Sequence, residues 1–124
     1  RVVHIREVSA GTTLGYGVTY QAGGPERWAT LSIGYADGLP RSLGERGSAL
    51  IGGKRVPILG RISMDVTVVD ITDVPEVIEG AVATLIGRDG DEVITVEDVA
   101  AMAGTINYEI LVGLTPRLPR VWCP

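Results

Sequence analysis

Short β-prone runs, several of which alternate apolar and polar residues, fill most of the chain. Alternation with a period of two is typical of strands that bury one face. Such runs lie at residues 2–8, 16–20, 28–33, 49–51, 54–58, 66–71, 81–86 and 92–94. Gly52-Gly53 separates two of them by two residues, which is the spacing of a tight β-hairpin. The pattern therefore predicts six or more short strands joined by turns.

Helical signals are confined to the C-terminal part of the chain. Thr95 and Asp98 have the spacing of a capping box and Gly104 is a typical helix stop, so we expect a helix over residues 96–103. A second short helix is expected from residue 105 or 107 to about 112. Together these elements predict an all-β (mainly β) fold, a small closed or partly open β-barrel of short antiparallel strands with two short C-terminal helices.

Composition narrows the classes of protein that fit. A chain of 124 residues makes one domain, residues 1–124, and 45% hydrophobic residues with 21% charged residues argue against disorder. The net charge is -4 and the basic residues are dispersed, so we expect neither nucleic acid nor a membrane as partner. No apolar run is long enough to span a bilayer, no signal peptide is recognisable, and Cys123 is the only cysteine. These features predict a cytoplasmic location.

Several kinds of chemistry lack their residues. With His4 as the only histidine and a single cysteine, we expect no metal site. No Gly-x-Ser-x-Gly motif and no phosphate-binding glycine pattern is present. Lys54 is the only lysine, and its place directly after the Gly52-Gly53 turn predicts a solvated side chain. Schiff-base chemistry needs a lysine that its surroundings keep deprotonated, which this chain does not supply convincingly.

Tyrosines are the remaining candidates for chemistry. The chain has four Tyr and no Phe. Tyr16 lies between two glycines, and Tyr35 and Tyr108 lie beside loop and cap residues, where a hydroxyl can meet a ligand. A tyrosine that acts as a base at neutral pH needs a cationic partner or a preorganised hydrogen bond to favour its charged form. Arg41 or Arg61 could be that partner, although both could equally be ordinary surface charges, and groups of another chain could serve instead.

Four motifs then point to a family. Residues 15–20 (GYGVTY), 33–41 (IGYADGLPR), 60–65 (GRISMD) and 104–109 (GTINYE) together resemble the C-terminal domain of alanine racemases, in the same order and with fitting separations. The resemblance covers nearly all of this chain but only about a third of the family's protein. It implies that an N-terminal (β/α)₈ barrel, which carries the lysine that binds pyridoxal 5'-phosphate, is absent from this chain. That agrees with the single, solvated lysine.

The resemblance also implies roles for individual residues. Tyr16 would be the base that exchanges the α-proton on the L-face of alanine, and the barrel lysine would serve the D-face, because inversion needs proton transfer on opposite faces. Tyr108 would donate to the cofactor phosphate, and the backbone amide of Met64 would bind the substrate carboxylate. Met64 could instead be a core residue and Tyr108 could simply pack its ring. The residues of the substrate entryway would be Tyr35, Arg41, Arg61 and Ile106, with Asp65 close by.

The partners follow from the same resemblance. This domain would complete the barrel of a partner subunit, so the active unit would be a head-to-tail homodimer and the isolated domain would be inactive. Its D-alanine would supply bacterial peptidoglycan, the cell-wall polymer. Two alternatives stay open: a serine or broad-specificity amino-acid racemase of the same fold, and a free-standing, non-catalytic β-barrel interaction module.

Overall fold

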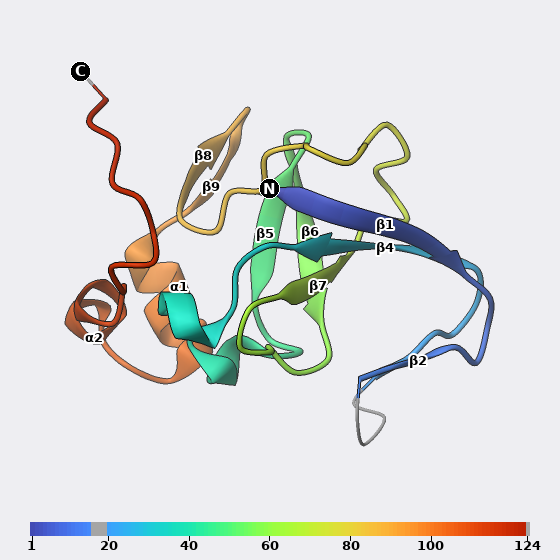
Figure 1. Ribbon diagram of the computed structural model, residues 1–124, viewed down its shortest axis with the longest axis horizontal. Coiled ribbons are helices and arrows are strands. Elements are labelled where there is room, and N and C mark those ends of the chain that lie inside the picture. The colour runs from blue at the N-terminus through green and yellow to red at the C-terminus, as the bar shows by residue number, and fades with distance from the viewer. Residues whose placement is uncertain (16–19, 124) are drawn as a thin grey trace.

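The computed structural model describes residues 1–15 and 20–123, and it consists mainly of short antiparallel strands with two short helices near the C-terminal end (Figure 1). The largest sheet has five strands in the order β1-β4-β7-β6-β5. Their bounds are Val2–Val8, Glu26–Leu31, Thr67–Asp70, Lys54–Leu59 and Ser48–Ile51 in that order. The two smaller sheets pair β2 (Thr13–Leu14) with β3 (Tyr20–Gln21), and β8 (Gly87–Asp89) with β9 (Glu92–Ile94). The prediction of a mainly β fold is confirmed.

The core lies against one face of the large sheet. Ala29 of β4 pairs with Val69 of β7, which in turn pairs with Ile58 of β6, and all three side chains are buried. They belong to one continuous apolar cluster that also reaches both helices through Val99 and Ile110. Removal of this apolar surface from water is the main force that holds the strands together.

The sequence predicts a closed or partly open barrel, and the described strands do not form a closed one. Within the described part of the chain, β1 and β5 are the two edges of the sheet, and no ladder of strands joins them. Residues 80–84 connect the edges instead. Val2 N–H donates to Ala81 O (2.9 Å) and Gly80 N–H to Val2 O (2.8 Å), whereas Leu50 and Thr84 exchange two hydrogen bonds of 2.8 Å each. The described strands therefore form an open sheet with an irregular bridge between its edges.

The same bridge explains why the strand expected at residues 81–86 is wrong. This segment bonds first to one edge strand and then to the other, so only Thr84 forms an isolated β-bridge. A strand needs several consecutive bonds to one neighbour. The strand expected at 28–33 is also displaced, since β4 runs from Glu26 to Leu31 and the chain then leaves the sheet. The hairpin of β5 and β6 is confirmed.

Both helices are where the sequence predicts them. Helix α1 (Val96–Ala103) begins with a capping box in which Thr95 N–H donates to the Asp98 carboxylate (2.9 Å) and Asp98 N–H donates to Thr95 Oγ1 (3.0 Å). Helix α2 (Asn107–Val112) follows after Gly104. No helix in residues 1–15 and 20–123 is both long and apolar enough to cross a membrane.

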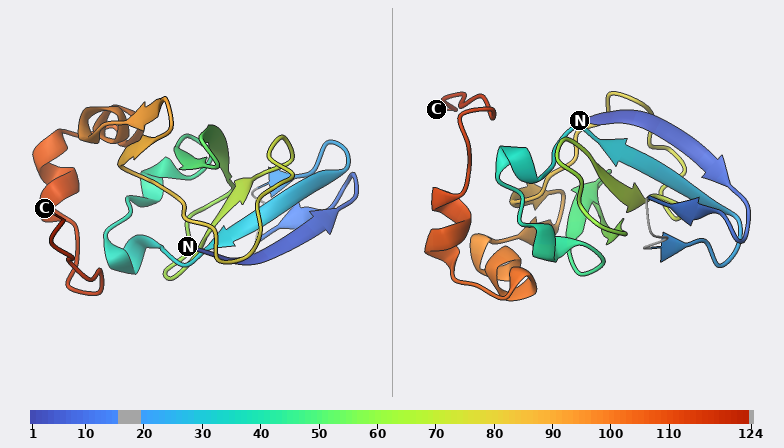
Figure 2. Two further views of the ribbon diagram at one scale, coloured as in Figure 1. Left: turned by 90° about the horizontal axis from the view of Figure 1, so that it is seen from above. Right: turned by 60° about the horizontal axis from the view of Figure 1, so that its bottom comes forward.

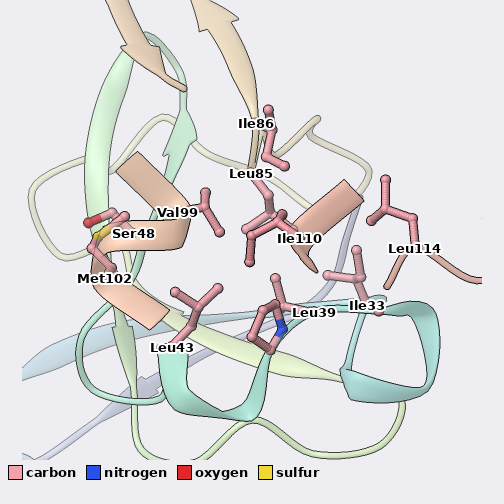
Figure 3. A pocket seen from close by; sticks show the side chains of 12 residues that line it. Ile33, Leu39, Leu43, Ser48, Leu85, Ile86, Val99, Met102, Ile110 and Leu114 are labelled. Atoms are coloured by element: carbon pink, nitrogen blue, oxygen red, sulfur yellow. The ribbon is translucent and has the colours of Figure 1, made fainter. Parts of the chain in front are cut away.

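The helices lie at one end of the molecule, where they cover residues 33–43 and one end of the large sheet (Figures 1 and 2). Figure 3 shows Val99 of α1, Ile110 of α2, and Leu39 and Leu43 pointing toward one another. The cavity that remains between them is only about 50 Å³. Ordinary ligand pockets have roughly 300 Å³ or more, so this space is a gap in the apolar core.

Candidate functional site

Two of the predicted motifs meet through backbone hydrogen bonds. A short 3₁₀ turn, η1 (Tyr35–Asp37), lies directly on the segment that contains Ser63 and Met64. Tyr35 N–H donates to Ser63 O and Ala36 N–H donates to Met64 O, both at 3.0 Å. Any Cβ at Gly34 would overlap those two carbonyl oxygens. Residue 34 is therefore glycine because only glycine permits this close approach of two backbones.

A buried carboxylate ties the turn to the C-terminal segment. Asp37 is only 6% exposed, and its Oδ2 accepts from Gly34 N–H at 2.9 Å. Arg117 places Nε 3.2 Å from Asp37 Oδ1 and donates from Nη2 to Asp65 Oδ1 at 2.7 Å. Thr115 N–H also donates to Asp37 O (3.1 Å). Three segments that are distant in sequence thus meet around one arginine. The pKa of Arg117 is raised, and the hydrogen bond to Asp65 is the largest cause.

A hollow of about 250 Å³ opens beside this cluster and contains residues from three of the four motifs. Its described lining residues are Leu14, Gly15, Arg41, Arg61, Ile62, Ser63, Val66 and Val68. Two arginines and no carboxylate lie among them, so the hollow favours anionic groups. Gly15 directly precedes Tyr16 in the sequence, but Tyr16 itself lies outside the described residues.

The other candidates lie at the surface. Met64 is 51% exposed, which contradicts the alternative that it is a core residue, and Tyr108 is 71% exposed. Tyr35 is exposed as well, and the Arg41 guanidinium lies 5.6 Å from the centroid of its ring, within cation–π range. Arg41 itself begins a second 3₁₀ turn, η2 (Arg41–Leu43). Asp65 is exposed and bonded to Arg117.

Ile106 and Tyr108 come from the start of helix α2. Ile106 is the N-cap residue of α2 and Tyr108 lies in its first turn. Neither lines the hollow that contains Arg41 and Arg61. The structure thus brings Tyr35, Arg41, Arg61, Met64 and Asp65 to one region, whereas Ile106 and Tyr108 are not among the described residues that line its hollow.

Two donors of the candidate residues have no acceptor in the described part of the chain. Neither the Met64 backbone N–H nor the Tyr108 hydroxyl has a hydrogen-bond partner among residues 1–15 and 20–123. Met64 O, in contrast, accepts from Ala36 N–H. An exposed N–H or phenol of this kind can donate to an anionic oxygen such as that of a carboxylate or a phosphate.

The lysine needed to attach an aldehyde cofactor is not provided. Lys54, the only lysine, is exposed at the hairpin turn that begins β6. In the described part of the chain, no three His, Cys, Asp or Glu residues gather in a way that could hold a metal ion. The exposed Tyr108 hydroxyl could donate to a phosphate group, whereas the exposed Lys54 does not fit the attachment of an aldehyde cofactor.

Glu26 holds together the region that flanks residues 16–19. Its carboxylate accepts from Tyr20 OH and Trp28 Nε1, each at 2.9 Å, and from Gly23 N–H at 3.1 Å. Burial raises the pKa of Glu26, but the three hydrogen bonds outweigh it, so the pKa is lowered. Burial, followed by the bond to Glu26, raises the pKa of Tyr20 to about 12. Tyr20 is therefore a protonated, structural donor at neutral pH.

Sequence reasoning missed the pairing of Asp37 and Arg117. Asp37 lies in one of the quoted motifs, whereas Arg117 follows Pro116 in a segment without any recognisable pattern. An ion pair between residues so far apart in the chain leaves no local signal.

Comparison with known proteins gives a consistent result. A family model described as "Alanine racemase, C-terminal domain" matches residues 1–122. The alanine racemase of Halothermothrix orenii is 44% identical over 120 residues, which cover 97% of this chain and 32% of that protein. The catabolic alanine racemase of Agrobacterium fabrum is 49% identical over 121 residues, with coverages of 96% and 30%.

Solved structures agree. Alanine racemase from Bacillus anthracis with bound L-Ala-P matches with a TM-score of 0.92 and 45% identity, over 99% of this chain and 31% of that one. Alanine racemase from Bartonella henselae with covalently bound pyridoxal phosphate matches with a TM-score of 0.90 and 36% identity, over 98% and 33%. The chain thus spans about a third of the length of the relatives that it matches.

Proposed function

This chain belongs to the family of alanine racemase C-terminal domains, and from that premise we propose that, in its full-length parent, it takes part in the interconversion of L- and D-alanine with pyridoxal 5'-phosphate. Bacterial peptidoglycan synthesis in the cytoplasm would use the D-alanine. The observation that carries the proposal is the hollow in which Gly15, Arg41, Arg61 and Ser63 meet. It gathers three separate family motifs around one space that favours an anion.

In this proposal Tyr16 is the base for the L-face of the substrate. Its neighbour Gly15 lines the hollow together with Arg41 and Arg61, and cationic neighbours favour the charged form of a phenol. Pyridoxal phosphate, when bound, withdraws electrons from the α-carbon of the amino acid and makes its hydrogen easier to remove. Tyr16 then takes or returns that proton on one face, while a lysine of the N-terminal barrel serves the other.

The remaining candidates bind and orient. The Met64 N–H donates to the substrate carboxylate, and the Tyr108 hydroxyl donates to the cofactor phosphate; neither donor has an acceptor among residues 1–15 and 20–123. Substrate reaches the site through an entryway whose residues are Tyr35, Arg41, Arg61, Asp65 and Ile106. The exposed placement of Tyr35 and Ile106 supports this role, because entryway residues must face solvent.

The proposal also assigns partners. Residues 1–124 form one domain of a longer polypeptide whose N-terminal (β/α)₈ barrel holds the cofactor, and two subunits associate head to tail. Large apolar side chains on and beside α2 are exposed and support a covering partner. They are Ile106, Tyr108, Leu111 and Val112.

The test is α-proton exchange in D₂O by the full-length parent and its Tyr16→Phe variant, with L-alanine and D-alanine assayed separately. We expect exchange from L-alanine to fall by roughly 10²–10⁴-fold, the usual contribution of a positioned base. Exchange from D-alanine should continue through the barrel lysine. Bound pyridoxal phosphate, measured by absorbance, is the control for an intact site.

An equal loss for both substrates, or no loss for either, would show that Tyr16 is not the L-face base. Racemisation of serine and lysine by the wild-type parent is measured in parallel. A rate on either that matches the rate on alanine would favour the alternative of a broad-specificity racemase.

A further inference from the structure

Arg117 is a single side chain that connects two motifs of the proposed site. Its Nε lies 3.2 Å from Oδ1 of the buried Asp37, and its Nη2 donates to Oδ1 of the exposed Asp65 at 2.7 Å. The guanidinium is planar and presents its donors in a fixed arrangement. Arg117 therefore sets the distance between the two carboxylates that it joins, which a flexible ammonium group could not do.

Met64 lies between the two parts of the chain that Arg117 joins, the turn that contains Asp37 and the residue Asp65. Its carbonyl accepts from Ala36 N–H in the turn that Asp37 caps, and the next residue, Asp65, is bonded to Arg117. On the other side, Ser63 O accepts from Tyr35 N–H and Ser63 N–H donates to Val66 O at 3.1 Å. Within the described chain, the Met64 N–H is one of the donors that this network leaves without an acceptor, together with the N–H groups of Asp65 and Val66.

Stability alone does not account for this arrangement. The pair of Arg117 and Asp65 is exposed, and exposed ion pairs contribute little to folding. The chain has a comparable pair in Arg55 and Glu92, 3.4 Å apart and also exposed, which lies away from the motifs. What distinguishes Arg117 is its second contact to a buried carboxylate that caps the turn beneath Met64.

We infer that Arg117 is a positioning residue: acting through Asp37 and Asp65, it holds the Met64 backbone amide in the orientation that receives the substrate carboxylate. The inference rests on the proposed function, in which that amide binds alanine. A misplaced donor weakens binding of the carboxylate, while the groups that transfer the proton keep their own geometry. Loss of Arg117 should therefore act mainly on KM.

The experiment compares the full-length wild-type parent with Arg117→Met and with the matched control Arg55→Met. KM and kcat are measured for both alanine enantiomers, together with inhibition by propionate, which has the carboxylate of alanine without its amine. In Arg117→Met we expect KM and the propionate inhibition constant to rise about tenfold, the usual effect of losing one charge-assisted hydrogen bond. The kcat should change much less, and Arg55→Met should behave as wild type.

A second arm follows hydrogen–deuterium exchange of peptides that cover residues 61–66. Exchange there should become faster in Arg117→Met and stay unchanged in Arg55→Met. The KM of Arg117→Lys should lie between those of wild type and Arg117→Met, because one ammonium group can reach one carboxylate at a time.

The outcomes separate this inference from the proposed function. If the wild type is active, and Arg117→Met has the same KM and the same propionate inhibition constant as the wild type, the inference is overturned and the proposed function is not. Equal changes in Arg117→Met and Arg55→Met, or a fall in kcat without a change in KM, overturn it too. A wild-type parent that holds pyridoxal phosphate but does not racemise alanine overturns both.

Discussion

At the residue scale, Glu26 shows how one carboxylate organises a region of the molecule. It accepts hydrogen bonds from a phenol, an indole and a backbone amide. Trp28 is buried, and the Tyr20 ring meets its ring edge to face at a centroid distance of 5.8 Å. The Arg6 guanidinium carbon lies over the Trp28 ring, 5.1 Å from its centroid. This small cluster is separate from the main core and includes both strands that flank residues 16–19.

Removal of the phenol should therefore destabilise the chain. We expect Tyr20→Phe to lower the free energy of unfolding at pH 7 by about 1–2 kcal/mol, because it removes a hydrogen bond to a charged, partly buried acceptor. The pKa of Glu26 is lowered in the folded state. Its contribution to the free energy of unfolding is therefore full above the unfolded pKa and is lost as pH falls through the folded pKa. The difference in free energy of unfolding between wild type and Tyr20→Phe should therefore become smaller in that acidic range.

The alkaline range gives a second reading of the same variant. The folded pKa of Tyr20 is about 12 and the unfolded value is 10.0, so its contribution is full below pH 10 and is lost as pH rises toward 12. Urea denaturation across pH should show this loss in wild type and not in Tyr20→Phe. Parallel pH profiles for the two proteins would contradict the assigned role.

At the element scale, the turn of residues 34–38 decides how the motifs meet. Gly34 permits the contact with Ser63 and Met64, and Gly38 ends the turn with a φ of 109°, a conformation that residues with a Cβ rarely adopt. A Cβ at Gly38 would also overlap Gly113 O, at the end of α2. The turn is thus held between the segment of Ser63 and Met64 and the end of the second helix.

Gly38→Ala should be more damaging than a change at a glycine that has only an unusual φ. Gly53 is the matched control, because its φ is 77° and no heavy atom lies within 4 Å of a Cβ built there. We expect about 1 kcal/mol of destabilisation for Gly53→Ala and roughly 3 kcal/mol or more for Gly38→Ala, where the overlap adds to the backbone strain. Chemical denaturation of the two variants measures the difference, and equal effects would contradict the steric argument.

Elements whose bonds are local could be predicted from the sequence. The capping box of α1 joins residues three positions apart, and the hairpin turn of β5 and β6 spans two residues. The segment at 81–86 could not, because its composition suits a strand while its partners, Val2 and Leu50, lie on two different edges. The structure of this segment depends on where the two edge strands of the sheet, β1 and β5, lie in space.

At the scale of the whole molecule, the chain spans about a third of each relative that it matches. The surface of α2 and the C-terminal segment expose large apolar side chains, up to Trp122 at 90%. Exposed apolar groups of this size favour burial against another polypeptide surface. The proposed catalytic site is accordingly one to which this chain contributes only part.

The isolated chain should therefore be inactive. We expect no racemisation of alanine by residues 1–124 alone, and no tight binding of pyridoxal phosphate, because Lys54 is exposed on a hairpin. A D-alanine assay and the absorbance of bound cofactor after gel filtration measure both. Any weak cofactor absorbance should disappear in Lys54→Met. Turnover by the isolated chain would contradict the proposal that the barrel is required.

The mainly β class, the hairpin, the two helices and the four motifs that resemble the family can be predicted from the order of residues alone. These depend on contacts between near neighbours or on residue identity, and both can be read along the chain. Tertiary structure alone decided that the sheet stays open, that Arg117 joins Asp37 to Asp65, and that Gly15, Arg41 and Arg61 share one hollow. Such contacts join residues far apart in sequence, so their geometry is set only when the sheet brings distant segments together.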